Sequence, residues 1–280
     1  MKKLVLLLAF VALSAVHTLS QSPFSLKRMT TKTETFSFGS GGTVSIIGAP
    51  RGSITVDGGP GNEIEVTAEI EIEAATDADL SALSEVVGFV LDGGRTKSSI
   101  ITIGPHNKFG GRKLPKKFPK HLMGLPFRIN YVIKVPLYTD LQIDGGVGEL
   151  KIKSVQGSSR INFLDATGTV EVGGSMTATF GAGSVDVVFG VNGWRGRTAN
   201  IQMATGNLSI AFPAKMSADV DARVLRTGKV ENLVPALKPR GPKAAFTDQA
   251  VLATAGAGGV PLIFSVGDGT LKLTRLDPRL

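Results

Sequence analysis

The segment from Thr139 to Val224 decides the fold, because one short unit recurs along it. The unit is Gly-x-Φ-x-Φ, where Φ is aliphatic, and it reads Gly148-Glu-Leu-Lys-Ile, Gly168-Thr-Val-Glu-Val, Gly183-Ser-Val-Asp-Val and Gly206-Asn-Leu-Ser-Ile. Alternating apolar and polar residues are typical of strands with one buried face. A glycine at the start of each unit suits a corner where the backbone turns sharply.

Each unit is too small to bury its own apolar face, whereas a stack of successive units buries a continuous one. We therefore predict an all-β protein built around a β-solenoid-like stack of short strands. The residues predicted to point inward are Leu150, Ile152, Ile161, Phe163, Val170, Val172, Val185, Val187, Ile201, Met203, Leu208, Ile210 and Phe212.

The region upstream adds strands of the same kind. Residues 33–38 alternate and are predicted to form a first strand after a loose polar leader, and further Gly-x-Φ-x-Φ copies begin at Gly42 and Gly52. Residues 63–73 alternate most regularly and place five glutamates on one strand face. That face could be a calcium or acid–base site, but side chains that project in parallel favour a solvated face that resists aggregation.

Residues 77–90 are predicted to form the one inserted helix. Thr76 and Asp79 resemble a capping box, and the apolar residues that follow have helical spacing. At the other end of the chain, Pro261–Val266 and Gly269–Leu273 are predicted to pair as a terminal hairpin that caps the stack. The predicted organisation is a signal peptide (1–20), a leader with the first strand (21–39), and a single β-repeat domain (40–280).

Composition limits the compartment and the chemistry. The 280 residues contain no cysteine, which excludes disulfides, thiol catalysis and cysteine-bound zinc. Residues 1–20 have two lysines before a short apolar run and small residues near a cleavage point, as in an export signal. We therefore expect an exported protein, periplasmic or at the cell surface, with no membrane span after the signal is removed. The formal net charge is +8, of which the signal lysines supply two.

A long loop over residues 105–127 is the first candidate binding site. Its Gly, Pro and basic residues, with two interleaved phenylalanines, could bind an anionic polysaccharide or a membrane surface, or could be a solvated loop. In an exported protein, nucleic acid is not expected as a partner. Two histidines flank the loop without a third ligand, so no metal site is predicted. The candidate residues are Lys108, Arg112, Lys113, Lys116, Lys117 and Lys120.

A second candidate site is the turn-rich loop of residues 190–197. It carries Trp194, the only tryptophan, followed by Arg195 and Arg197. An exposed indole beside two guanidinium groups could stack on a sugar or anchor a partner. The alternative is that the tryptophan folds back over the end of the stack.

No motif for catalysis is present in the sequence. Gly-x-Ser-x-Gly, the phosphate-binding Gly-x-x-x-x-Gly-Lys-Ser/Thr and His-Glu-x-x-His are all absent. The acidic residues Asp144, Asp165, Glu171 and Asp186 lie on different units and form no readable pair for sugar cleavage. We therefore predict no enzymatic activity and no cofactor.

The arrangement resembles the bacterial putative-adhesin family of β-strand repeats. The resemblance covers about residues 40–275, and the long basic loop departs from the family pattern. It implies export, a solenoid-like stack and a role at the cell surface or envelope, with no catalytic residue to carry over. It is carried by residues 129–136, by Leu141–Gly148, by the glycine units at 148, 168, 183 and 206, and by the upstream helix followed by Ile100–Ile103.

Three hypotheses follow for function. The first is a surface or envelope protein that binds an anionic envelope polymer or surface ligand. The second is a module that senses or assembles with an envelope protein. The third is a carbohydrate-active enzyme on a β-helix.

Overall fold

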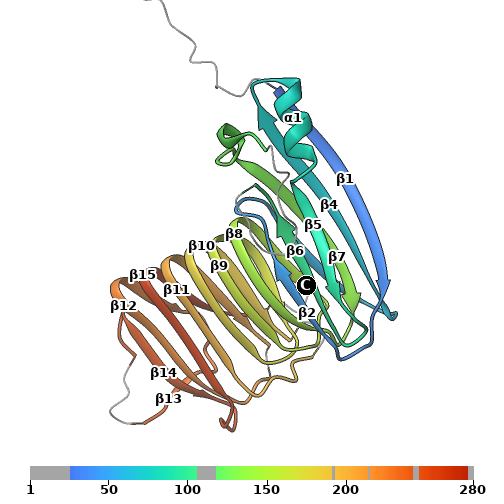
Figure 1. Cartoon of the computed structure of the whole chain (residues 1–280). Coiled ribbons are helices and arrows are strands. Elements are labelled where there is room, and N and C mark those ends of the chain that lie inside the picture. Colours follow the sequence, from blue (N-terminus) through green and yellow to red (C-terminus); the bar gives the residue numbers. More distant parts are fainter. Residues whose placement is uncertain (1–25, 106–117, 191–192, 214, 242–245, 277–280) are drawn as a thin grey trace, which may run out of the picture.

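The computed structural model describes residues 26–105, 118–190, 193–213, 215–241 and 246–276. These residues form a 15-stranded sheet (Figure 1) whose main path runs β1-β4-β7-β3-β8-β9-β10-β11-β15-β12-β14-β13. Among them, no helix is both long and apolar enough to cross a membrane. The strands are β1 (Leu26–Ser37), β2 (Thr43–Ile47), β3 (Ile54–Gly59), β4 (Glu63–Ala74), β5 (Gly88–Gly93), β6 (Lys97–Ile103), β7 (Phe127–Pro136), β8 (Asp140–Lys153), β9 (Ser159–Val172), β10 (Met176–Phe189), β11 (Ala199–Phe212), β12 (Ala218–Asn232), β13 (Lys238–Pro239), β14 (Ala250–Ala255) and β15 (Pro261–Arg275).

Strands β8 to β11, β15 and β12 lie side by side, parallel and in register. Parallel neighbours cannot be joined by a tight hairpin, so the chain returns from the end of each strand to the start of the next through a loop. We call the segments 154–158, 173–175 and 193–198 the return loops. All thirteen residues predicted to point inward are buried, so that prediction is confirmed.

Glycines mark a corner in the middle of these long strands. Four aligned corner positions are Gly148 in β8, Ala166 in β9, Gly183 in β10 and Gly206 in β11. The glycines at 148, 183 and 206 have φ values of +157°, +123° and +130°, which a side chain rarely accepts. In β9 the positive φ falls two residues later, at Gly168. A Cβ at Gly206 would lie 2.0 Å from the carbonyl oxygen of Gly183, so the corners also need glycine for close backbone approach.

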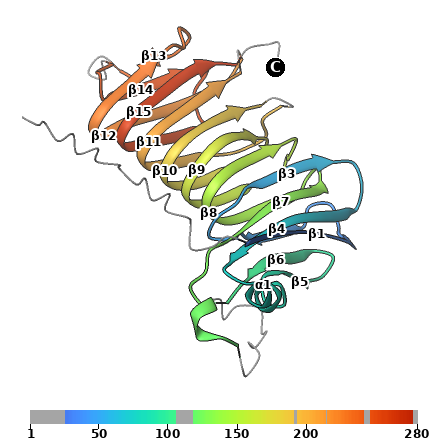
Figure 2. The ribbon, with the colours of Figure 1, turned by 90° about the horizontal axis from the view of Figure 1, so that it is seen from above.

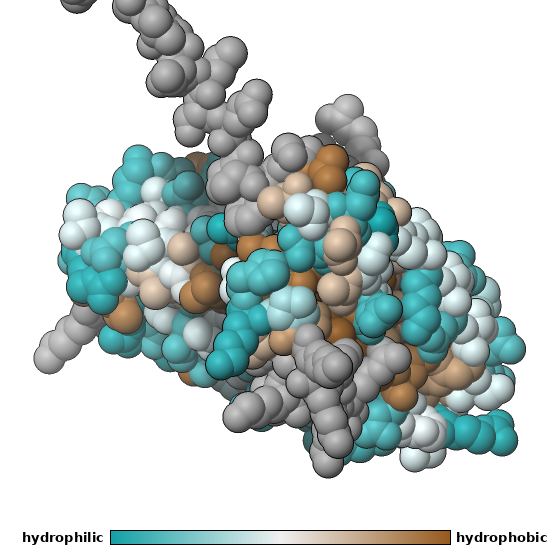
Figure 3. Space-filling view, turned by 45° about the horizontal axis from the view of Figure 1, so that its top comes forward, coloured by the Kyte–Doolittle hydropathy of each residue, from teal (hydrophilic) through white to brown (hydrophobic). Residues whose placement is uncertain are grey.

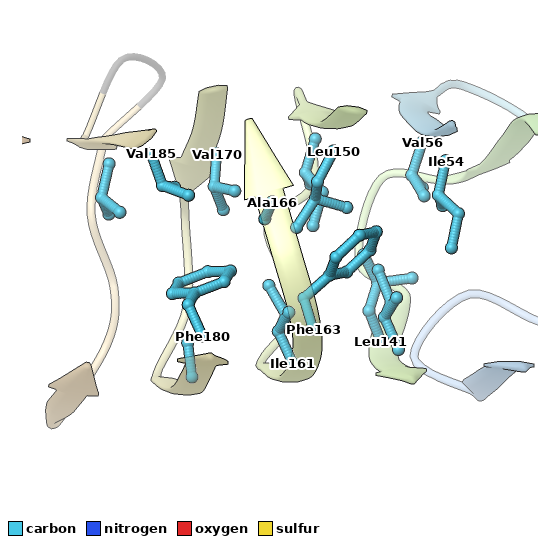
Figure 4. Packing of buried hydrophobic residues seen from close by; sticks show 14 of the residues in the cluster. Ile54, Val56, Leu141, Leu150, Ile161, Phe163, Ala166, Val170, Phe180 and Val185 are labelled. Carbon is cyan, nitrogen blue, oxygen red and sulfur yellow. The ribbon is translucent and has the colours of Figure 1, made fainter. Parts of the chain in front are cut away.

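The corners divide each long strand into halves whose apolar side chains face each other across the core. Figure 4 shows Val170 and Val185 in one layer and Ile161 and Phe180 in the other. Strand β2 pairs with the first half of β8 and β3 with its second half, so these two short strands continue the two layers.

The N-terminal region extends both layers, first with one parallel strand each, β6 beside β2 and β7 beside β3, and then with antiparallel strands. Beyond β2 lie β6 and β5, and beyond β3 lie β7, β4 and β1. Tyr131 of β7 joins the layers: its ring packs edge-on against Phe89 of β5 at 5.9 Å, and its hydroxyl is 2.8 Å from Thr102 Oγ1 of β6. Burial raises the pKa of Tyr131, which outweighs the lowering effect of the Thr102 hydrogen bond, so the phenol stays protonated.

Helix α1 (Asp77–Ser84) is shorter than the predicted 77–90. The predicted cap is confirmed, because Asp79 N donates to Thr76 Oγ1 at 3.1 Å. The C-terminal half of the prediction was wrong: residues 88–90 belong to β5, which pairs with β6. The β-branched Val86 and Val87 and then Gly88 favour leaving the helix at this point. Figure 2 shows α1 end-on at the N-terminal edge of the molecule.

Strand β1 begins at Leu26, so the prediction of a loose leader as far as residue 32 was wrong. Its twelve residues pair in register with all twelve of β4, and this neighbouring strand orders polar residues that show little apolar periodicity of their own. The predicted alternation in β4 is confirmed, with Ile64, Val66 and Ile72 buried and the glutamates on the outer face. Residues 1–25, which include the predicted signal, lie outside the described part of the chain.

The C-terminal segment does not form the predicted capping hairpin. Pro261–Arg275 is one strand, β15, that lies between β11 and β12 and is parallel to both. Gly269 is a corner glycine with φ +138°, aligned with Gly206 and Gly228, and not a hairpin turn. The last strand in the sequence, β15, therefore occupies the position next to β11 in the sheet. Strand β14 pairs antiparallel with β12, nearer the end of the sheet.

Candidate functional site

The described part of the chain does not bring the two predicted sites together. Lys108, Arg112, Lys113, Lys116 and Lys117 lie outside the described residues. Lys120 opens the short 3-10 helix η1 (Lys120–Leu122), which lies near α1: the neighbouring His121 Nε2 is 3.0 Å from Asp79 Oδ1. Hydrogen bonds from Thr76 and His121 lower the pKa of Asp79. Trp194, Arg195 and Arg197 lie instead between β10 and β11 (Figure 1).

Trp194 anchors its return loop to the core. Its ring packs edge-on against Phe189 at 5.5 Å, and its Nε1 donates to the carbonyl oxygen of Gly174 at 2.9 Å. The side chain is half-buried, in agreement with the alternative in which it folds back on the stack. The polar edge of the indole is thus already bonded within the protein, which fixes the loop that carries the two arginines.

The fixed loop presents Arg195 and Arg197 to solvent. The Arg195 guanidinium lies 5.9 Å from the ring centroid of Tyr138, whose side chain is 44% exposed. The backbone N–H groups of the arginines donate to Gly173 O at 2.7 Å and to Ser175 Oγ at 3.0 Å. Within the described ranges, neither guanidinium has an acidic partner within 4.0 Å. An arginine over an exposed aromatic ring can contact both sugars and anions.

Sequence reasoning missed Tyr138, because it lies 57 residues before Arg195 and stands beside no repeat glycine. Because β8 and β11 are parallel, the turns that precede them lie on the same side of the strand stack. This arrangement brings Tyr138 and Arg195 together. Its place two residues after Pro136, which ends β7, was the one available signal.

A polar groove begins at the return loops and crosses the outer face of β8, β9 and β10. Its volume is about 240 Å³, and an adjoining hollow of about 200 Å³ continues it. Gln142 and Arg160 line both. Ser175, which accepts the Arg197 N–H bond, lines the first, so the groove and the arginine loop form one continuous surface. The remaining polar lining residues are Thr43, Asp140, Asp144, Ser158, Ser159, Asn162 and Thr177.

The acidic residues considered for sugar cleavage have structural partners or stand apart. Asp144 Oδ1 accepts from Asn162 Nδ2 at 2.8 Å, and Glu171 Oε2 accepts from the backbone N–H of Ser154 at 2.8 Å. Asp165 and Asp186 lie on β9 and β10, on opposite sides of the corner. In the described ranges, no group of three His, Asp or Glu side chains is placed to hold a metal ion.

Comparison with known proteins finds similar solved structures at low sequence identity only. No protein-family model matches the chain, and no curated protein matches it in sequence. A putative cell adhesion protein from Clostridium sporogenes is 12% identical, with a TM-score of 0.48, over 88% of this chain and 100% of that one. A putative adhesin from Bacteroides fragilis is 13% identical, with a TM-score of 0.30, over 87% and 97% of the two chains.

Proposed function

We propose that this is an exported, non-enzymatic interaction protein of the bacterial cell envelope or cell surface. In this proposal the strands form a β-solenoid module that binds an envelope polymer or another surface ligand. The observation that carries it is the exposed pair of Arg195 and Tyr138, held beside Arg197 by the anchored Trp194. This cluster stands on a rigid stack of parallel strands, as expected of a binding surface that does not rearrange.

The chemistry of the cluster favours an anionic partner. The two arginines have no acidic partner among the described residues, so they carry uncompensated positive charge. The predicted basic loop is a second, separate cationic candidate, through Lys113, Lys116, Lys117 and Lys120. On the face shown in Figure 3, hydrophobic residues form scattered patches among hydrophilic ones.

Co-sedimentation with envelope fragments of the host tests the proposal. The protein without its signal is mixed with the fragments at low and high salt, as wild type, as Arg195→Gln/Arg197→Gln, and with the four loop lysines changed to Gln. The matched control is Arg95→Gln/Lys97→Gln, which removes two exposed charges from the turn after β5 and from the first residue of β6. We expect binding that weakens in high salt and in the first two variants but not in the control, because exposed charges are screened by salt.

Absence of wild-type binding at low salt would contradict the proposed function. Binding that neither salt nor the arginine and lysine variants change would instead favour an envelope protein as the partner. Release of soluble sugar from the fragments, lost on mutation of a specific acid pair, would favour the carbohydrate-active enzyme.

A further inference from the structure

We propose that the polar groove on the outer face of β8, β9 and β10 binds neutral, hydroxyl-rich sugar residues of a linear glycan. This inference rests on the proposed function, since it assigns a sugar-binding track to the surface next to the arginine loop. It concerns different residues and a different chemistry, because the arginine loop selects for charge and the groove for hydroxyl groups.

The parallel register arranges outer side chains in two rows, and all of them except Thr179 line the groove. One row is Gln142, Arg160 and Thr177, and the other is Asp144, Asn162 and Thr179, with each residue beside its neighbour on the next strand. All six side chains are exposed. Adjacent strands are about 4.8 Å apart, so hydrogen-bonding groups repeat at a fixed interval across the groove. A repeating ligand matches a repeating row, whereas a single small molecule favours a concave, mostly apolar pocket.

Several of these groups are free to bind a ligand. Asn162 is bonded to Asp144, and the Asp140 carboxylate accepts from the backbone N–H of Ser158 at 2.7 Å, so both carboxylates are held in place. In contrast, the side chains of Gln142, Arg160, Thr177 and Thr179 have no hydrogen-bond partner within the described ranges. Together these groups offer amide, guanidinium and hydroxyl donors beside fixed carboxylate acceptors, which suits pairs of sugar hydroxyls.

The charge of the groove favours a neutral ligand. Its lining holds one cation, Arg160, and two carboxylates, Asp140 and Asp144, so its net charge is slightly negative. A polyanion would meet those carboxylates, and nucleic acid requires several phosphate-binding cations. A protein partner is disfavoured as well, because interface hot spots are enriched in Trp, Tyr and Arg that fill desolvated pockets. The groove rows contain no aromatic residue.

Isothermal titration with neutral hexasaccharides tests the inference. The probes are β-1,4-glucan, β-1,3-glucan, α-1,4-glucan and N-acetylglucosamine hexamers, together with the neutral glycan fraction released from the host envelope; polygalacturonate is the charged comparison. The groove variant is Gln142→Ala/Thr177→Ala. The matched control is Thr169→Ala/Asn207→Ala, which removes exposed polar groups from the same strand stack beyond the corner. Thermal denaturation checks that both variants fold.

We expect at least one neutral glycan to bind with an affinity that salt hardly changes, and the groove variant to lose about tenfold in affinity while the control does not. Failure of every neutral probe would overturn the inference, as would equal affinity of the wild type and the groove variant. Both failures are distinct from failure of the proposed function. If the wild type sediments with envelope fragments in a salt-sensitive way but binds no neutral glycan, the proposed function stands without the groove.

Discussion

Two outer surfaces of the same sheet differ in how they use polar side chains. On β1, β4 and β7 several outer residues are charged, and most of these are bonded to a neighbour on the next strand. Lys27 lies 2.8 Å from Glu71 and 3.1 Å from Glu73, Lys134 lies 3.0 Å from Glu65, and Asn130 donates to Glu69 at 3.2 Å. Four of the five glutamates on this strand are thus matched by partners on the neighbouring strands, so this face balances most of its own charge.

On the first halves of β8, β9 and β10, four of the six outer residues in the two rows carry an amide or a hydroxyl group, and three of these four have no hydrogen-bond partner within the described ranges. The threonine side chains among them lose less conformational entropy on binding than lysine or glutamate does. The comparison indicates that an outer strand face is a candidate binding surface when its polar groups have no hydrogen-bond partners within the protein. The face of β1, β4 and β7, whose charged groups mostly pair with one another, shields the sheet. The face of β8, β9 and β10, where several polar groups lack partners in the described part of the chain, is the one that we propose binds a ligand.

The largest expected effect concerns the backbone geometry that makes the second surface regular. Gly206→Val places a side chain at φ +130°, with its Cβ 2.0 Å from Gly183 O, so we expect destabilisation of about 3 kcal/mol or more, or loss of folding. Gly59→Val at the end of β3 is the control, because no atom lies within 4 Å of its Cβ. Thermal denaturation followed by circular dichroism measures both. Equal melting temperatures for the two variants would contradict the corner geometry.

A smaller effect is expected where the two layers of the N-terminal region meet. Tyr131→Phe removes the buried hydroxyl that bonds to Thr102, and we expect a loss of about 1–2 kcal/mol in the free energy of unfolding. Tyr138→Phe changes an exposed ring and is the matched control. Urea denaturation separates the two. A stability of Tyr131→Phe equal to that of the wild type would show that the bond does not join the layers.

A pH effect is expected near the C-terminal end of the stack. The backbone N–H of Gly259 and the hydroxyl of Thr254 bond to Asp219 and lower its pKa from the ordinary value of 3.8. Because the folded-state pKa is lowered, this stabilisation is present above pH 3.8 and is lost as the pH falls below it through the lowered pKa. Asp219→Asn should therefore lose less stability on acidification than the wild type. Urea midpoints at neutral and acidic pH measure this, with Asp186→Asn as control.

The smallest effect is expected on the charged surface itself. Lys27→Gln breaks two exposed ion pairs, and we expect no measurable change in melting temperature at physiological salt, since exposed ion pairs contribute little. Differential scanning calorimetry at low and physiological salt tests this. A clear loss of stability at both salt concentrations would mean that this surface is held together by its charges.

Much of the stack could be predicted from the sequence, because glycine and strict alternation are local signals. The inward residues from Leu150 to Phe212 follow directly from period-two alternation. The place of β15 could not be predicted, since its alternation is equally suited to a hairpin and to an inserted strand. The start of β1 was missed for a similar reason: its order comes from pairing with β4.

The candidate site was predictable in part. Trp194, Arg195 and Arg197 are evident as a turn with an unusual composition, but whether the indole faces solvent depends on Phe189 and Gly174, which only the fold brings near. Tyr138 and the groove rows carry no motif. They become a surface only through the register between strands, a property of pairing that no single strand encodes.

Hydrogen–deuterium exchange with and without envelope fragments from the host tests the central claim most directly. The return loop 193–198 carries the two arginines, and the return loops 154–158 and 173–175 border the groove. Strands β1, β4 and β7 instead carry the surface whose charged groups mostly pair with one another. The account predicts slower exchange in those return loops and unchanged exchange on β1, β4 and β7. Slower exchange confined to β1, β4 and β7, or no change anywhere, would contradict it.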